Sequence, residues 1–497
     1  MDTFVNNNYY LCIVFQKCHP MKKIIARDKE ISRLEELYNS KRPEFVIVYG
    51  RRRIGKTFLV NQVFEKRFTF SFVGAKKESQ KVQLKRFAAQ LQRYGSSTFT
   101  PALESWEDAF DELRRLIESK SKKQRKVIFL DEMPWIDTPR SRFLSALEYF
   151  WNAWAAQRDD IMFIACGSAT SWMVNRILRN RGGLHNRFTA QIYLRPFNLN
   201  ESEEFLHSSG CNWDRYTILQ SYMTFGGVPY YLSQLNSKES LAQNIDRLFF
   251  AKNAPMKLEF DELFSALFPH ANKYVDVMKA LSQKRGGMMR SEIIVSTGIS
   301  GGGLSKILDN LERCDFITIY SRYKSSVRNS LYRICDPYTL FYFKFVHSRN
   351  RKDVHFWSNN LTSPSVVAWQ GFSFETICIE HLDQIKRKLG ISGIGTNSCT
   401  WRKVGTKDEQ GTQIDLLIER ADRVINICEM KFSDSAYNIT KDYENKLRTK
   451  LSVFREETRT TKSILLTMVT TYGITMGIHS GIVTNEVCMN DLFEKAY

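Results

Sequence analysis

The sequence predicts an α/β fold whose first half is built on a parallel β-sheet. Between about residues 24 and 197, short apolar segments alternate with helical segments, which is the pattern of strands joined by crossover helices. The apolar segments carry few charges, so both faces of the sheet are expected to be covered. The chain has 497 residues, more than one hydrophobic core usually serves, and about two to four domains are therefore expected.

The first domain is predicted at residues 21–197. Its five strands are expected at residues 44–49, 68–73, 127–130, 161–166 and 191–194. Helices are expected between them at residues 56–66, 81–93 and 105–119. Residues 1–20 have no clear pattern and are interpreted as an N-terminal extension or as the result of a misassigned start.

The rest of the chain divides into three further parts and a connector. Residues 198–270 have a helical pattern with one break at 225–229. Residues 271–337 have the order and length of a winged helix, with helices at 274–282, 291–297 and 304–314 and strands at 316–320 and 330–334. An aromatic connector is expected at 338–368, and an α/β domain at 369–497 that begins with a helix at 374–389.

The charge balance favours a polyanionic partner. The chain has 72 Lys and Arg residues against 53 Asp and Glu residues, a net charge of +19, which points toward nucleic acid such as DNA. No apolar segment reaches the roughly 18 residues that cross a bilayer, so no membrane association and a cytoplasmic location are expected. The ten cysteines include no C-x-x-C pair, and residues such as Cys166 are interpreted as small core residues.

One segment matches the phosphate-binding pattern G-x-x-x-x-G-K-[ST] at every position. The candidate nucleotide-binding residues are Gly50, Arg51, Arg52, Arg53, Ile54, Gly55, Lys56, Thr57 and Phe58. The glycines let backbone N–H groups converge on phosphates, and the following helix directs its positive end at the same anion. Lys56 can reach the β and γ phosphates of ATP, and the Thr57 hydroxyl can ligate Mg²⁺. The context fits, because the segment follows a predicted strand and opens a predicted helix.

Polar residues follow two other predicted strands. Asp131 and Glu132 come after the strand at 127–130, where ligands bind in parallel sheets. Asp131 would hold the magnesium ion and Glu132 would orient the attacking water; the alternative is an acidic pair that merely ends a strand. Ser168 follows the strand at 161–166 and either touches the γ-phosphate or caps a helix.

These motifs resemble the archaeal-type ATPase family, within the STAND branch of the AAA+-related P-loop NTPases, over residues 24–235. The segments that carry the resemblance are YGRRRIGKT (49–57), FLDE (129–132), ACGSATSWM (165–173), NRFTAQIYLRPF (186–197) and GGVPYYL (226–232), together with Ile25-Ala26-Arg27. The resemblance implies that Ser168 is a sensor residue and that Arg187 senses the γ-phosphate, although Asn186 replaces the glycine of the family. It also implies that residues 198–270 are a helical lid.

The predicted winged helix carries a group of basic residues. Lys284, Arg285, Arg290, Lys306 and Arg313 surround the expected recognition helix, and Arg322, Lys324 and Arg328 lie between the two strands. Such side chains contact DNA phosphates without selecting a sequence. The alternative is a protein–protein module whose charges are solvated.

The C-terminal domain carries a second candidate site. Asp415 lies at the start of one predicted strand, and Glu429 and Lys431 lie two apart at the end of the next, so those two share a face. In a hairpin Asp415 lies beside Glu429, and the carboxylates can bind Mg²⁺ while Lys431 polarises a water; Glu375 is an extra metal ligand. The alternative is a surface ion pair between Glu429 and Lys431.

This part resembles the PD-(D/E)XK restriction-endonuclease-like fold. The residues that carry the match are WQGFSFE (369–375), GTQIDLLI (411–418) and ICEMKF (427–432). The resemblance implies that Glu375, Asp415, Glu429 and Lys431 are the nuclease positions, and it does not establish cleavage.

The resulting hypothesis is a Mg²⁺-dependent ATPase that acts with DNA. Its fold class is an α/β P-loop NTPase parallel sheet with a helical lid, a winged helix and a C-terminal restriction-endonuclease-like domain. The alternative function is a nucleotide-dependent switch or scaffold without nuclease activity. A homo-oligomer remains open.

Overall fold

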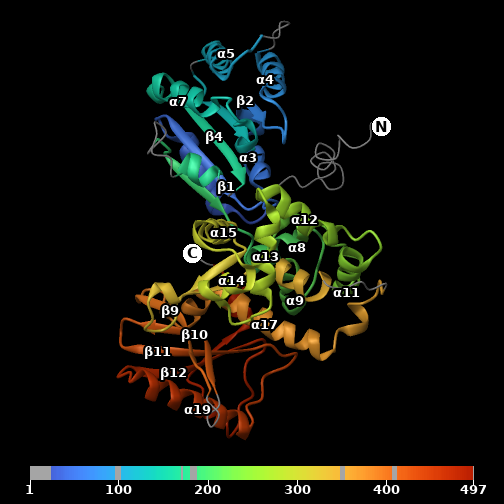
Figure 1. Cartoon of the computed structure of the whole chain (residues 1–497), viewed down its shortest axis with the longest axis vertical. Helices are drawn as coiled ribbons and strands as arrows, with labels where there is room; N and C mark the ends of the chain where they lie inside the picture. The colour runs from blue at the N-terminus through green and yellow to red at the C-terminus, as the bar shows by residue number, and fades with distance from the viewer. Residues whose placement is uncertain are drawn as a thin grey trace. The chain divides into compact units, whose positions relative to one another are not determined.

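The chain forms two compact units. The computed structural model describes residues 24–95, 102–121, 123–168, 172–178, 187–347, 353–405 and 411–495. The first unit comprises the chain up to Tyr49 together with Gly55–Ser168 and Trp172–Leu194, and the second comprises Gly50–Ile54 and the chain from Arg195 onward. Figure 1 shows the chain coloured from its N-terminus to its C-terminus.

The first unit is built on a five-stranded sheet. The strands are β1 (Glu44–Gly50), β2 (Phe68–Val73), β3 (Lys126–Asp131), β4 (Ile161–Ser168) and β5 (Ala190–Leu194). They lie in the order β2-β3-β4-β1-β5, and β3 runs parallel to both β2 and β4. The predicted α/β fold is therefore confirmed, and every strand begins within one residue of its expected position.

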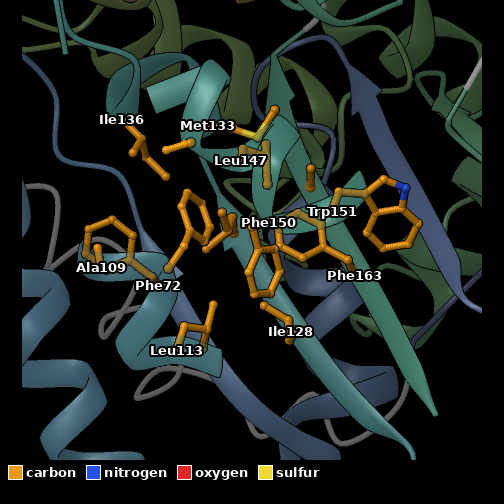
Figure 2. Close-up of a cluster of buried hydrophobic side chains, with 14 of the residues drawn as sticks. Phe72, Ala109, Leu113, Ile128, Met133, Ile136, Leu147, Phe150, Trp151 and Phe163 are labelled. Carbon is orange, nitrogen blue, oxygen red and sulfur yellow. The ribbon is translucent and has the colours of Figure 1, made fainter. Parts of the chain in front are cut away.

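Helices cover the sheet on both faces. Those of the first unit are α2 (Asp28–Asn39), α3 (Lys56–Phe64), α4 (Gln80–Gly95), α5 (Trp106–Glu118), α6 (Met133–Ile136) and α7 (Phe143–Ala153). Figure 2 shows one face, where Phe72, Ile128 and Phe163 of the strands pack with Leu113 of α5 and Phe150 of α7. Each such buried side chain stabilises the fold by about 1.5–3 kcal/mol. Because neighbouring strand residues point to opposite faces and all of β3 and β4 is buried, the other face is covered as well.

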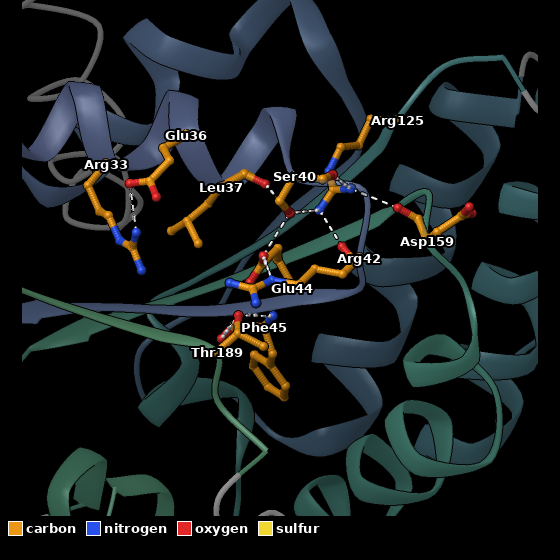
Figure 3. Close-up of polar contacts among 10 residues, drawn as sticks. All are labelled: Arg33, Glu36, Leu37, Ser40, Arg42, Glu44, Phe45, Arg125, Asp159 and Thr189. Carbon is orange, nitrogen blue, oxygen red and sulfur yellow. Dashed lines mark hydrogen bonds and ion pairs between the residues drawn. The ribbon is translucent and has the colours of Figure 1, made fainter.

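A polar cluster closes the amino ends of these strands. Glu44 at the start of β1 accepts hydrogen bonds from Ser40 Oγ at 2.7 Å and Arg42 Nε at 2.8 Å (Figure 3). Arg125 donates to the backbone oxygens of Ser40 and Asp159 at 2.6 and 2.8 Å. Burial alone would raise the pKa of Glu44, but the hydrogen bonds lower it below its ordinary value. With these ends satisfied by structural contacts, the carboxyl ends of the strands are left for ligands.

The second unit begins with helices. They are α8 (Leu199–Ser208), α9 (Arg215–Phe225), α10 (Pro229–Leu232), α11 (Leu241–Ile245) and α12 (Pro255–Leu267). The break after α9 has a steric cause, because a Cβ added at Gly227 would lie 1.7 Å from the backbone oxygen of Phe197. The Gly226-Gly227 pair of the resemblance thus provides a close approach of two backbones in this unit.

The basic middle segment folds into three helices and a small sheet. Its elements are α13 (Ala271–Ser282), β6 (Met288–Met289), α14 (Arg290–Thr297), α15 (Gly301–Arg313), β7 (Ile317–Tyr320) and β8 (Leu331–Ile334). The sheet order is β6-β8-β7, with both pairs antiparallel. The strand β6 was not among the predicted elements, because a strand of two residues is too short to give a period.

The remaining elements form a second five-stranded sheet with helices. They are α16 (Pro337–Phe341), α17 (Pro364–Glu380), α18 (Leu382–Lys388), β9 (Thr396–Lys403), β10 (Thr412–Arg420), β11 (Val424–Lys431), α19 (Lys441–Thr458), β12 (Ser463–Thr470), β13 (Asn485–Cys488) and α20 (Met489–Leu492). The order is β13-β12-β11-β10-β9, antiparallel from β9 to β11 and parallel from β11 to β13.

The single helix expected at 374–389 is two helices. The first begins earlier, at Pro364, because the Ser363 side chain accepts a hydrogen bond from Val366 N and proline suits the first helical turn. It ends at Glu380, and α18 starts after His381. In the part of the chain that the structure describes, no helix has the length and apolar character needed to cross a membrane.

Candidate active site

The phosphate-binding segment has the backbone shape expected from its glycines. Gly55 precedes α3 with a φ of 86°, a left-handed conformation that favours glycine. A Cβ placed there would meet no atom within 4 Å, so Gly55 provides a conformation and open space for an anion. Lys56 and Thr57 follow in the first turn of α3, with Lys56 buried, Thr57 half-buried and Phe58 half-buried behind them. The positive end of α3 therefore lies beside a lysine and a hydroxyl.

Thr57 and Asp131 meet across the carboxyl edge of the sheet. The Thr57 hydroxyl donates a hydrogen bond of 2.7 Å to Asp131 Oδ2. One residue begins α3 and the other ends β3, so two motifs 74 residues apart are brought together by the fold. Asp131 is buried and also accepts from the Glu132 N–H at 2.8 Å. A hydroxyl and a carboxylate in contact are hard oxygen donors of the kind that Mg²⁺ prefers, so these residues fit that ion.

Glu132 has a strained backbone. Its φ of 48° and ψ of 45° place a non-glycine residue in the left-handed region, just before α6. Such conformations persist only where the surroundings enforce them, and they concentrate at functional sites. The side chain is half-buried. Glu132 therefore follows the end of β3 with a backbone conformation that breaks the alternation of side chains between the two faces of the sheet.

Cys166 is a residue of this site that sequence analysis assigned to the core. Burial raises the pKa of its thiol well above the ordinary value, and Asp131 raises it further through its charge and a side-chain hydrogen bond. Lys56 and Glu132 also act on the thiol electrostatically. β4 lies between β3 and β1, which puts Cys166 and the buried Ser168 beside both motifs. Only the strand order could have revealed this placement.

Arg187 is exposed just before β5. Among the described residues nothing joins its side chain to Lys56, Thr57 or Asp131. Asn186 lies outside the described residues. The γ-phosphate-sensing role of Arg187 stays a prediction.

The first arginine of the segment is buried within the second unit. Arg51 donates to Asp336 Oδ1 and Oδ2 at 2.6 and 3.3 Å, with the two side chains 1% and 2% exposed. Its guanidinium lies 4.5 Å from the Phe316 ring centroid. Burial would lower the pKa of Arg51, but the charge and hydrogen bond of Asp336 together with the influence of Tyr231 and Asp315 raise it.

The other variable positions of the segment differ in environment. Arg53 pairs with Glu259 at 2.7 Å and lies 4.0 Å from the Tyr230 ring centroid. Gly50 and Ile54 are buried and Arg52 is half-buried. In this structure Arg51 and Arg53 serve as structural anchors of the segment, a role that the motif alone does not specify.

The C-terminal carboxylates gather around two lysines. The β10–β11 register pairs Leu416 with Cys428, and continuing it by one residue sets Asp415 opposite Glu429. Lys431 Nζ lies 2.9 Å from Glu429 Oε1, as their shared face predicts. Burial, followed by the charge of Asp415, raises the pKa of Glu375 to about 7.

Two residues that sequence analysis missed hold Glu429 in place. Lys450 Nζ lies 2.5 Å from Glu429 Oε2 and the Tyr443 hydroxyl donates to Oε1 at 2.8 Å, both from α19. Burial alone would raise the pKa of Glu429, but Lys450 and Lys431 lower it to about 2. Within the described ranges no three His, Cys, Asp or Glu residues are grouped so that they could hold a metal ion. The metal-binding role of Glu375, Asp415 and Glu429 stays a prediction.

Three of the five basic residues around the expected recognition helix have internal partners. Lys284 forms an ion pair with Glu292, Arg313 with Asp309 at 2.8 Å, and Arg290 donates to Gly301 O at 2.8 Å.

The expected wing packs onto the C-terminal sheet. Tyr323 N donates to Thr400 O at 2.9 Å, and the Tyr323 side chain is buried in the core of that sheet. Arg322 forms a β-bridge with Thr400, and Lys324 Nζ donates to Thr458 O at 3.1 Å. Of the three cations between the two strands, Lys324 therefore has a side-chain partner within the unit, whereas the contact of Arg322 is made by its backbone. Arg328, and Lys306 on α15, are exposed.

Comparison with known proteins supports the geometry of the first unit. Residues 24–235 match a family described as an ATPase domain predominantly from Archaea. An uncharacterized protein of Methanocaldococcus jannaschii is 24% identical over 414 residues, covering 82% of this chain and 88% of that protein. The Walker-type ATPase of Pyrococcus abyssi is similar in fold, with a TM-score of 0.50 and 17% identity over 65% of this chain and 97% of that one. Residues 24–235 therefore match an ATPase domain found predominantly in Archaea, and the chain is an ATPase with the P-loop fold.

Proposed function

We propose that this protein is a Mg²⁺-dependent ATPase that acts with DNA. The observation that supports magnesium-dependent hydrolysis most directly is the contact between Thr57 and Asp131, because it places two oxygen donors beside Lys56 at the start of α3. An acidic pair that merely ended a strand would have no reason to meet the hydroxyl of the phosphate-binding segment.

Each residue of the site has a separate chemical role. The Lys56 ammonium binds phosphate oxygens, and the N–H groups at the start of α3 orient them. Thr57 and Asp131 would hold Mg²⁺, which when bound neutralises charge on the phosphates. The Glu132 carboxylate accepts a proton from the attacking water, and Ser168 orients that water. Negative charge that develops on the phosphoryl group is stabilised by Arg187 or by an arginine of a second copy of the chain.

Two substitutions test this assignment. Glu132→Gln is expected to bind ATP while its kcat falls about 10²–10⁴-fold, because the amide cannot accept the proton. Lys56→Ala is expected to lose ATP binding itself. Glu107→Gln, exposed on α5 of the same unit, is the matched control and should hydrolyse ATP like the wild type. The proposal fails if a fluorescent ATP analogue binds equally to the wild type and to Lys56→Ala.

Action on DNA is supported by the charge of +19 and by the helix order of the middle segment. ATP hydrolysis measured with and without DNA tests it. A rate that DNA does not change, together with no DNA binding, would favour the nucleotide-dependent switch.

For the C-terminal domain we propose a nuclease-like fold that serves as a scaffold in this conformation. The reason is that Glu429 is neutralised by Lys431 and Lys450. Supercoiled plasmid with Mg²⁺ or Mn²⁺ is the test, comparing the wild type with Asp415→Ala and Lys431→Ala. If the wild type cleaves the plasmid and neither variant does, the domain is a nuclease and the scaffold proposal is wrong.

A further inference from the structure

A pocket of about 220 Å³ lies within the second unit, and Trp369 and Phe372 of α17, the helix that also carries Glu375, are among the residues that line it. Its walls come from α13 with the loop that follows it, from residues 340–347 and from α17. α13 contributes Lys279 and Ser282, and Arg285 follows in the next loop. The residues lining the pocket are Lys279, Ser282, Gln283, Arg285, Leu340, Phe343, Lys344, His347, Trp369 and Phe372.

The lining is cationic without any carboxylate. Lys279, Arg285 and Lys344 are exposed, and none of them forms an ion pair within the described part of the chain. Burial, followed by the charge of Lys279, lowers the pKa of His347. Asp261 acts on His347 in the opposite direction but does not line the pocket. Three unneutralised cations around one cavity select an anionic ligand.

Aromatic rings form the rest of the wall. Trp369 and Phe372 lie three residues apart on α17 and so share a face of that helix. The Phe372 ring is held by Arg333, whose guanidinium lies 4.6 Å from the ring centroid, and Arg285 lies 5.7 Å from the same centroid. Phe343 packs against His347 with ring centroids 5.2 Å apart. A simple inorganic anion would need the cations alone, whereas the rings suit a planar, apolar group.

We propose that this pocket binds a nucleotide, with Lys279, Arg285 and Lys344 on its phosphate and Phe343 and Phe372 against its base. Bases stack on aromatic side chains whatever their sequence, and basic side chains beside the rings bind the backbone. The nucleotide is either free or one unit of a single-stranded nucleic acid. None of the residues that line the pocket belongs to the phosphate-binding segment or to α15.

The test uses the full chain and a fluorescein-labelled oligothymidylate, with thymidine monophosphate as the free-nucleotide arm. Fluorescence anisotropy should show binding that Phe372→Leu weakens roughly five- to one-hundred-fold, the range for loss of one stacked base. Lys344→Ala is expected to weaken binding and to reduce its salt dependence by about one charge. Leucine keeps an apolar side chain at position 372, and circular dichroism confirms folding. If thymidine monophosphate also binds and Phe372→Leu weakens its binding, the ligand is a free nucleotide. If only the oligomer binds, the ligand is a single-stranded nucleic acid.

Lys257→Ala is the matched control, since Lys257 is exposed on α12, outside the pocket and outside the expected DNA-binding segment. It should bind the oligomer within about twofold of the wild type. Equal loss in Lys257→Ala and Lys344→Ala would show general attraction of a polyanion and would overturn the pocket. Unchanged binding in Phe372→Leu would overturn base recognition. ATP hydrolysis in all three variants should match the wild type, so failure of the pocket leaves the ATPase proposal standing.

Discussion

Removing the charge of Asp336 should destabilise the second unit strongly, because that carboxylate neutralises a guanidinium that solvent does not reach. Asp336 and Arg51 are 2% and 1% exposed and form a two-point contact. Asp336→Asn keeps an oxygen that can accept from Thr339 N at the start of α16, so the substitution isolates the charge. Breaking a buried pair by removing one partner costs about 3–5 kcal/mol.

A double-mutant cycle with Arg51→Met separates this pair from its surroundings. Each single substitution leaves one buried charge, whereas the double substitution leaves none. We therefore expect the double variant to lose at least about 2 kcal/mol less than the sum of the single losses. The assay is urea unfolding of the full chain, compared at the midpoint of the transition that contains the second unit. The exposed pair Arg114–Glu118 of the first unit is the control; it is measured at the transition of that unit, with an expected coupling of about 0.3–0.5 kcal/mol.

Additive effects within about 0.5 kcal/mol would refute the reasoning. A second readout follows from the position of Arg51 in the phosphate-binding segment. Asp336→Asn frees the guanidinium that anchors this segment, so ATP should bind more weakly even though Asp336 is not a site residue. Unchanged ATP affinity in a variant that unfolds more easily would restrict the pair to a structural role.

Three further predictions concern other parts of the chain. Cys166 should resist iodoacetamide at about pH 7 in the folded protein, because burial keeps its thiol protonated, and should react only after unfolding; peptide mass spectrometry checks this. Glu429 has a lowered pKa of about 2, so the stability it provides is complete above its unfolded pKa of about 4.5 and is lost as the pH falls toward 2. The difference in urea midpoint between the wild type and Glu429→Gln should therefore shrink from pH 7 to pH 3. A difference that stays constant over this range would contradict the prediction. Gly227→Ala should lower the free energy of unfolding by about 3 kcal/mol or more, because the added Cβ would overlap the backbone oxygen of Phe197. Gly393→Ala has open space around the added Cβ and should change that free energy little, and thermal unfolding compares the two variants.

The first unit was predictable because its signals are local. Each strand is a short apolar run with a clear start and end, and the catalytic motifs follow such runs directly. The contact of Thr57 with Asp131 also followed from a general rule, since the carboxyl ends of parallel strands share one edge. Cys166 was missed because its place beside Asp131 depends on β4 lying between β3 and β1, and strand order has no local signal.

The C-terminal cluster was predictable only in part. The two-residue spacing of Glu429 and Lys431 fixes a shared face, so their contact followed from strand geometry. Lys450 and Tyr443 come from α19, and a helix rotation that depends on packing decides which of its charges reaches the sheet. The helix start at Pro364 had a signal that sequence analysis did not use, a serine cap followed by proline.

The net charge of +19 is a property of the whole chain and does not locate a nucleic-acid surface. Lys284 and Arg313, both expected to face phosphates, are paired with carboxylates, and Lys324 donates to a backbone oxygen. A cation that already has a partner must give up that interaction before it can bind a phosphate, so its contribution to affinity is reduced. Lys344 has no such partner among the described residues and lines a cavity with aromatic walls. Charge that is both unneutralised and placed beside a surface for stacking is therefore the stronger indication of a nucleotide ligand, and in this chain that combination occurs in the pocket between α13 and α17.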